Sequence, residues 1–186
     1  VSDNDATNSI ITQLGGGSES AGLQLINEYI QEHGYTNTEI NRLMLRDTSN
    51  GDNYTSAADA AKILEEIYNG TCVSQSASEA MLGYLKNQQR KNKIPAGVPG
   101  SVETANRTGE LDDVQNDAAI IFKEGAPYIL VVMCSNVTDT NQVINDIVEI
   151  SKKVYGVDSE TITSDEDVKT TINSKVIDLK YIPEEK

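Results

Sequence analysis

The sequence predicts an α+β fold with a mainly helical first part, followed by an antiparallel sheet and a helix that packs on it. Apolar residues recur at helical spacing up to about residue 100, whereas short runs of β-branched and apolar residues follow it. Helical spacing then returns over residues 139–155. Because strands joined by short connections pair in antiparallel fashion, this order favours α+β over alternating strands and helices.

Four helices are expected in the first part, over residues 5–14, 18–33, 56–69 and 76–85. Glycines at positions 15, 34 and 70 follow the first three, as is common at helix C-termini. Capping boxes begin the last two, with Ser56 before Asp59 and Ser76 before Glu79. We therefore expect a mainly helical lobe over residues 1–100.

Residues 101–156 are expected to hold the strands and the packing helix. Two apolar strands, 117–123 and 128–134, flank a short hairpin connection, and a third strand is expected just before Arg107. The last part, residues 157–186, begins as an acidic connector and contains one more predicted strand at 176–182. Such a strand could cover an open edge of the sheet.

The charge balance argues against a polyanionic partner. The chain has 15 basic and 29 acidic side chains, a net charge of −14, which repels nucleic acid and anionic lipid. A basic cluster at residues 86–93 is therefore expected to be a solvated helix end. No apolar run is long enough to span a membrane, and no signal peptide is present. Because the sequence begins with valine, we expect a processed, excised or truncated chain.

No metal and no organic cofactor is expected. His33 is the only histidine and has no neighbouring cysteine or acidic ligand set. Cys72 and Cys134 are too few for a disulfide framework, although a bridge between them stays open. Cys134 ends an apolar strand and is expected to be buried.

Two polar triplets carry the chemistry that the sequence suggests. One is Ser2-Asp3-Asn4, and the other is Arg107-Thr108-Gly109, which Glu110 follows. In the second triplet the cation attracts a carboxylate, the hydroxyl adds a directional hydrogen bond, and the glycine lets a ligand lie against the backbone. A single triplet of this kind occurs by chance in many proteins, so the weight comes from the pair.

Together the triplets resemble the Ser-Asp-Asn and Lys-Thr-Gly motifs of the class A β-lactamases and their penicillin-recognising relatives. Residues 53–57 and 93–97 are also similar to that family, and the resemblance covers roughly residues 1–155. It implies a β-lactamase/transpeptidase-like fold, incomplete here at the N-terminus. An all-α lobe would lie against the sheet lobe, with the site in the cleft between them.

The resemblance assigns roles to the first triplet. Ser2 would belong to a proton-relay network opposite the nucleophile, and Asn4 would hydrogen-bond the substrate amide. Asp3 would mainly anchor the turn. The alternative is that all three residues simply cap the helix that follows, because Ser, Asp and Asn are all strong N-cap residues.

In the second triplet, Arg107 replaces the family's lysine. Its charge can still hold a substrate carboxylate, but a guanidinium does not readily give up a proton. Thr108 would contact the same carboxylate, Gly109 would let the strand run beside the ligand, and Glu110 would alter which carboxylate ligands are tolerated. The alternative is an ordinary strand that turns near a glycine.

Glu39 lies near the place of the family's loop glutamate, which activates the deacylating water. The asparagine that would follow it is replaced by Arg42 or Leu43. The alternative is that Thr36 and Glu39 form a capping box. Under that alternative the protein would acylate but hydrolyse slowly.

The Ser-x-x-Lys motif, which would supply the nucleophile, is absent from the sequence. The resemblance therefore implies the C-terminal portion of a secreted or cell-envelope serine hydrolase that opens β-lactams, with its nucleophile on a segment outside this chain. The chain alone is expected to be inactive. Two alternatives stay open: a penicillin-binding transpeptidase or carboxypeptidase acting on acyl-D-Ala-D-Ala-like substrates, and a degenerate domain that binds a ligand or partner without catalysis.

Overall fold

A computed structural model describes residues 2–49, 51–156, 170–172 and 175–181. The chain divides into two compact units, Val1–Asp59 and Ala60–Lys186. The three-part division at residues 100 and 156 stays a prediction. Both predicted kinds of element are present, five α-helices and an antiparallel sheet among the described residues.

The first unit contains α1 (Asn4–Leu14), α2 (Glu19–Glu32) and an irregular segment, residues 36–56. The two helices cross closely at Gly22, where an added Cβ would lie only 2.0 Å from the Ile11 carbonyl oxygen. No helix begins at Thr36, so the capping-box interpretation of that segment is wrong. The residues instead form an extended loop with an isolated antiparallel bridge between Glu39 and Tyr54.

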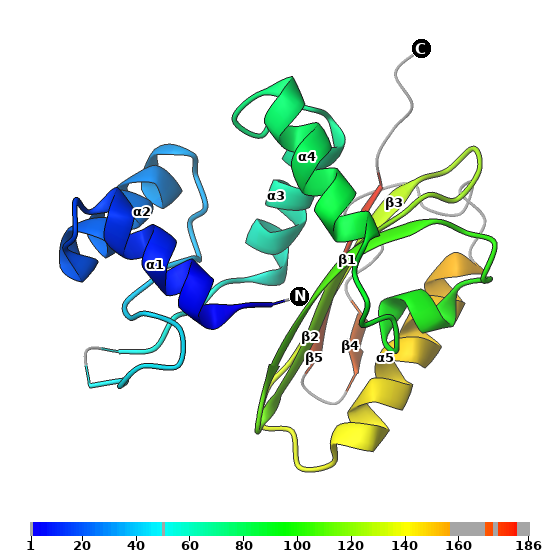
Figure 1. Ribbon diagram of the computed structural model, residues 1–186. Helices are drawn as coiled ribbons and strands as arrows, with labels where there is room; N and C mark the ends of the chain where they lie inside the picture. Colours follow the sequence, from blue (N-terminus) through cyan, green and yellow to red (C-terminus); the bar gives the residue numbers. More distant parts are fainter. Residues whose placement is uncertain (1, 50, 157–169, 173–174, 182–186) are drawn as a thin grey trace. The chain divides into compact units, whose positions relative to one another are not determined.

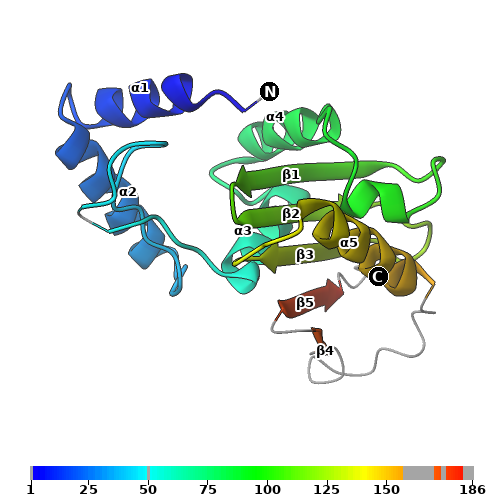
Figure 2. The same cartoon turned by 90° about the horizontal axis from the view of Figure 1, so that it is seen from below.

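The second unit is a sheet with helices on both of its faces. Its helices are α3 (Ala57–Tyr68), whose first residues belong to the first unit, α4 (Gln75–Lys86), the 3-10 turn η1 (Ile94–Gly97) and α5 (Thr140–Tyr155). Its strands are β1 (Thr104–Leu111), β2 (Val114–Ile121), β3 (Tyr128–Cys134), β4 (Thr170–Ile172) and β5 (Lys175–Tyr181). The strand order is β1-β2-β3-β5-β4, and every neighbouring pair is antiparallel. Figure 2 shows α5 across one face of the sheet and α3 behind the other.

The main hydrophobic core lies between the sheet and α5 (Figure 1). Alternate residues of β2 and β3 face this core, together with Ile94 of η1 and the valine and isoleucine stripe of α5. Ile147 of α5 is completely buried. The stripe predicted over residues 139–155 is thus confirmed as the packing face of that helix.

Both cysteines are buried thiols, and no disulfide joins Cys72 to Cys134. The strand predicted at residues 176–182 is present as β5, which pairs with the edge of β3. The predicted acidic connector and Ile182 lie outside the described residues. No helix in the described part of the chain is long and apolar enough to cross a membrane.

Candidate active site

The second triplet lies within β1, at one edge of the sheet. Among the described strands, β1 pairs only with β2, so its other edge has no strand beside it. The Phe122 N–H donates to the Glu103 carbonyl oxygen at 3.1 Å. In an antiparallel pair only every second residue is hydrogen-bonded to the partner strand, so from Glu103 onward the odd-numbered residues of β1 bond to β2. By that alternation the backbone groups of Thr108 and Glu110 point away from β2 and toward the free edge.

Arg107 places its guanidinium at the same edge. Its side chain is exposed, and Nη1 donates to the Thr108 carbonyl oxygen at 2.5 Å. Thr108 is buried, with 5% of its surface exposed. The free edge therefore offers a cation and outward-facing peptide groups within a few residues. This is a suitable surface for a ligand that carries a carboxylate and an amide.

Glu110 is held by two cations. Its carboxylate accepts hydrogen bonds from the Arg90 guanidinium and lies 3.0 Å from the Lys93 ammonium. The Lys93 side chain is completely buried, whereas that of Arg90 is 64% exposed. The prediction of a solvated basic cluster is thus wrong for Lys93, because the chain turns inward before η1 and buries it against β1 and β2.

A buried polar cluster lies next to Lys93. The Lys93 ammonium also donates to the Asn116 carbonyl oxygen at 3.1 Å, and Asp117 accepts from the Ile94 N–H at 3.0 Å and from the Asn106 amide at 3.0 Å. Burial raises the pKa of Asp117 to about 6, although the hydrogen bond from Asn106 opposes this rise. These bonds fix the residues before η1 beneath the strand that carries the triplet.

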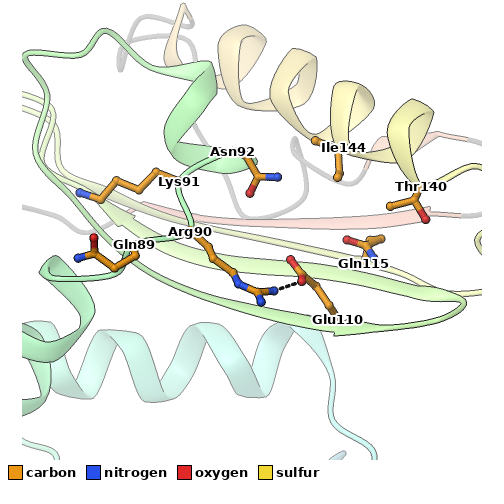
Figure 3. Close-up of a pocket in the computed structure, with 8 residues that line it drawn as sticks. All are labelled: Gln89, Arg90, Lys91, Asn92, Glu110, Gln115, Thr140 and Ile144. Carbon is orange, nitrogen blue, oxygen red and sulfur yellow. Dashed lines mark hydrogen bonds and ion pairs between the residues drawn. The ribbon is translucent and has the colours of Figure 1, made fainter. Parts of the chain in front are cut away.

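An open pocket of about 390 Å³ lies at the end of this region (Figure 3). Glu110 and Gln115 line it from β1 and β2, and Thr140 and Ile144 line it from α5. Residues 89–92 complete the wall. Glu110 is the one predicted site residue among its lining residues.

In the first unit, the Ser2-Asp3-Asn4 triplet begins α1. Asp3 is the N-cap residue, and its Oδ1 accepts from the Ala6 N–H at 2.9 Å. Ser2 is exposed and Asn4 is half-buried in the first turn. The capping role thus belongs to Asp3, and a contact of Ser2 or Asn4 with substrate stays a prediction.

Glu39 lies in the loop of the same unit, where its carboxylate accepts a hydrogen bond from the Tyr54 hydroxyl. Three asparagine side chains hold this loop, and each both donates to and accepts from one main-chain residue. The pairs are Asn27 with Ile40, Asn53 with Arg42, and Asn8 with Met44. Alternate residues of the segment 40–44 are therefore fixed.

Sequence reasoning missed the residues that support these candidates. Arg107, Thr108, Gly109 and Glu110 share one strand, whereas Ser2, Asn4 and Glu39 belong to the first unit.

The supporting residues were missed because asparagines inside helices and a lysine in a basic run carry no distinctive local signal. A usable signal was the polar residue Asp117 at a core-facing position of an apolar strand, because a buried carboxylate requires partners.

The chain matches the model of the "Beta-lactamase enzyme family" over residues 1–157. Among solved structures it is similar to "Structure of PBP-A", with 29% identity, a TM-score of 0.73, and coverage of 83% of this chain and 56% of that chain. It is also similar to a β-lactamase from Sphaerobacter thermophilus DSM 20745, with 26% identity, a TM-score of 0.69, and coverage of 84% and 60%.

An ancestral class A β-lactamase shares the fold at 22% identity, with a TM-score of 0.67 and coverage of 82% of this chain and 60% of that chain. None of the curated proteins compared with the chain matches it. The chain thus spans between half and two thirds of the length of these solved structures. The family model covers most of the sequence, and the fold agrees with it. The chain belongs to the β-lactamase enzyme family.

Proposed function

We propose that the chain is the substrate-binding portion of a β-lactam-opening serine hydrolase that works through an acyl-serine intermediate. The observation that carries the proposal is the free edge of β1, where the Arg107 guanidinium lies against the Thr108 carbonyl. In a member of the β-lactamase family, such an edge suits a substrate with a carboxylate and an amide.

Each residue then has a definite task. Arg107 and Thr108 hold the substrate carboxylate, and the outward N–H of Glu110 donates to the carbonyl oxygen as negative charge develops on it. Ser2 relays a proton, and Asn4 hydrogen-bonds the substrate amide. Glu39 activates water for deacylation. The nucleophilic serine and its base come from a segment outside this chain.

A joined protein tests the proposal. The chain is fused to the part of PBP-A that it does not cover and incubated with penicillin G, and the mass of the intact protein is measured. We expect a covalent adduct, whose formation slows by about 10- to 100-fold in Arg107→Ala, since a charge-assisted hydrogen bond is lost. Arg46→Ala, which removes an exposed arginine elsewhere, is the matched control. A folded fusion that forms no adduct would rule the proposal out.

A penicillin-binding transpeptidase or carboxypeptidase is the alternative. PBP-A is among the similar structures, and a mutant of it was solved as an "Acyl-enzyme complex with penicillin-G". The two proposals differ in deacylation. A hydrolase loses its adduct quickly, whereas a penicillin-binding protein keeps it. In the hydrolase, Glu39→Gln should prolong the life of the adduct.

A degenerate domain without catalysis is the third candidate, favoured by the arginine in place of lysine. In that case the joined protein would fold and bind no β-lactam. Export to the cell envelope or the exterior remains part of the first two proposals, since it rests on the family alone.

A further inference from the structure

Tyr54 lies opposite Glu39 in the loop of the first unit and has no task in the acyl-transfer proposal. The two residues form an isolated antiparallel bridge, in which the Glu39 N–H donates to the Tyr54 carbonyl oxygen at 3.0 Å. The Tyr54 N–H donates in return to the Glu39 carbonyl oxygen at 3.1 Å. Because directly opposed residues of an antiparallel pair project to the same side, the phenol and the carboxylate are neighbours.

The side chains of the pair are also joined by a hydrogen bond. The Tyr54 hydroxyl donates to the half-buried Glu39 carboxylate, and it is the one group bonded to that carboxylate among the described residues. Arg42, the nearest basic residue in the sequence, pairs instead with the Asp52 carboxylate at 2.6 Å. A neutral donor therefore orients Glu39 without cancelling its negative charge, which suits a general base.

The bond acts on the phenol as well. The hydrogen bond to Glu39 raises the pKa of Tyr54 above its ordinary value of 10, so the hydroxyl keeps its proton at neutral pH. A phenol has a single proton to donate, and this proton is bonded to Oε2 of Glu39. The second carboxylate oxygen, Oε1, can thus accept a hydrogen bond from a water molecule.

The main chain on both sides of Glu39 is fixed by other residues. Before it, the Thr38 hydroxyl donates to the buried Asp59 carboxylate at 2.7 Å. After it, the Asn27 side chain holds both the N–H and the carbonyl oxygen of Ile40. The backbone of Glu39 therefore has little freedom, and the freedom that remains is in its side chain, which the phenol restrains.

We propose that Tyr54 is the positioning residue of the deacylating base, and that the acyl-enzyme is hydrolysed slowly without its hydroxyl. The inference rests on the proposed function, in which Glu39 takes a proton from water while the water oxygen bonds to the ester carbonyl carbon. That proton passes to the serine oxygen as the ester bond breaks, so the carboxylate is regenerated. Tyr54 gives up no proton in this step, because it only holds one carboxylate oxygen.

The fusion with PBP-A tests this role through two rate constants, those of adduct formation and adduct loss. Tyr54→Phe removes only the hydroxyl of a residue that is 54% exposed, so the fold should be kept. Loss of the penicillin G adduct should slow about tenfold, since a hydrogen bond to a charged group is removed. Formation should stay unchanged, whereas a general disturbance of the first unit, which carries Ser2 and Asn4, would slow it too. Tyr84→Phe, in α4, is the matched control.

A double variant tests whether Tyr54 acts through Glu39. In the Glu39→Gln background, Tyr54→Phe should slow adduct loss no further, because the base that the phenol orients is already absent. The contact itself is measured without a β-lactam, by NMR titration of the tyrosine ring carbons of the unfused chain. Glu39→Gln should lower the pKa of Tyr54 toward its ordinary value of 10.

Unchanged adduct loss in Tyr54→Phe, beside slower loss in Glu39→Gln, would overturn this inference and leave the proposed function standing. Independent effects of the two substitutions, or a pKa of Tyr54 that Glu39→Gln does not move, would also overturn it. Adduct loss that neither substitution changes would remove Glu39 as the base, and the role of Tyr54 with it. A folded fusion that forms no adduct would overturn both proposals.

Discussion

The two units fix their polar segments in different ways. In the first unit, neutral amides of Asn8, Asn27 and Asn53 hold alternate residues of the loop that carries Glu39. In the second, the buried ammonium of Lys93 and the carboxylate of Asp117 belong to the cluster beneath β1.

The two sets of polar groups differ in the free-energy cost of their desolvation. A neutral amide that makes two good hydrogen bonds loses little on burial, whereas a buried ion requires a partner of opposite charge and responds to pH. The hydrogen bonds of the three asparagine amides should therefore be insensitive to pH, whereas the support of β1 should depend on it. Four substitutions test this comparison.

The largest effect is expected for Lys93→Met. The substitution leaves the Glu110 and Asp117 carboxylates without their buried cation, so the free energy of unfolding of the second unit should fall by about 3–5 kcal/mol. Lys86→Met removes a half-exposed partner of Glu103 and should cost less than about 1 kcal/mol. Urea unfolding followed by circular dichroism compares the two, and equal losses would contradict the account.

Asp117 should make stability depend on pH. Its folded pKa of about 6 lies above the ordinary value of 3.8, so the proton binds the folded state more tightly. The resulting stabilisation is complete below pH ~4 and is lost as the pH rises through ~6. The difference amounts to about 3 kcal/mol at ~1.4 kcal/mol per pKa unit.

The Asp117→Asn variant isolates this effect. Its free energy of unfolding, relative to that of the unmodified protein, should increase as the pH is raised from about 4 to 7. An offset between the two proteins that stays constant over that range would show that Asp117 is not the source.

Asn53→Ala should open the loop of the first unit. It removes the acceptor for the N–H groups of Asn41 and Arg42 and the donor to the Arg42 carbonyl, at a cost of about 2–3 kcal/mol. Hydrogen exchange should quicken over residues 40–44 at neutral and at acidic pH alike. Asn87→Ala, which loses one exposed bond to Gly83, is the control and should leave that loop unchanged.

The smallest effect is expected for Asp3→Ala. Loss of the N-cap should destabilise α1 by about 1 kcal/mol and increase exchange in its first turn. Asp5→Ala, in the same turn but without the capping bond, should have a weaker effect. Equal exchange in the two variants would mean that Asp3 does not position the triplet.

Much of the fold followed from periodicity. The helices at residues 4–14, 19–32 and 140–155 agree with the expected ones to within a few residues. The first two strands are longer than predicted, because β2 already begins at Val114 and β1 continues through Arg107 to Leu111. Polar and glycine residues at strand ends carry no strand signal, and pairing with neighbours decides their conformation.

Only those residues of the candidate site that belong to short motifs could be predicted from the sequence. Arg107 and Glu110 were identified from the triplet, but the partners Arg90 and Lys93 were not, since they approach through tertiary packing. The three asparagine side chains that hold the loop of the first unit were missed for the same reason. Asn8 and Asn27 lie within helices, where asparagine has no local advantage, and only the distant loop explains them.

Our central proposal is that both triplets serve one substrate, and chemical crosslinking tests this proposal most directly. Ser2→Cys and Arg107→Cys, two exposed positions, are combined and treated with a short bifunctional maleimide. The account predicts efficient intramolecular crosslinking of this pair and little of Ser2→Cys with Lys153→Cys. Equal crosslinking of the two pairs, or none for the first, would contradict a shared site.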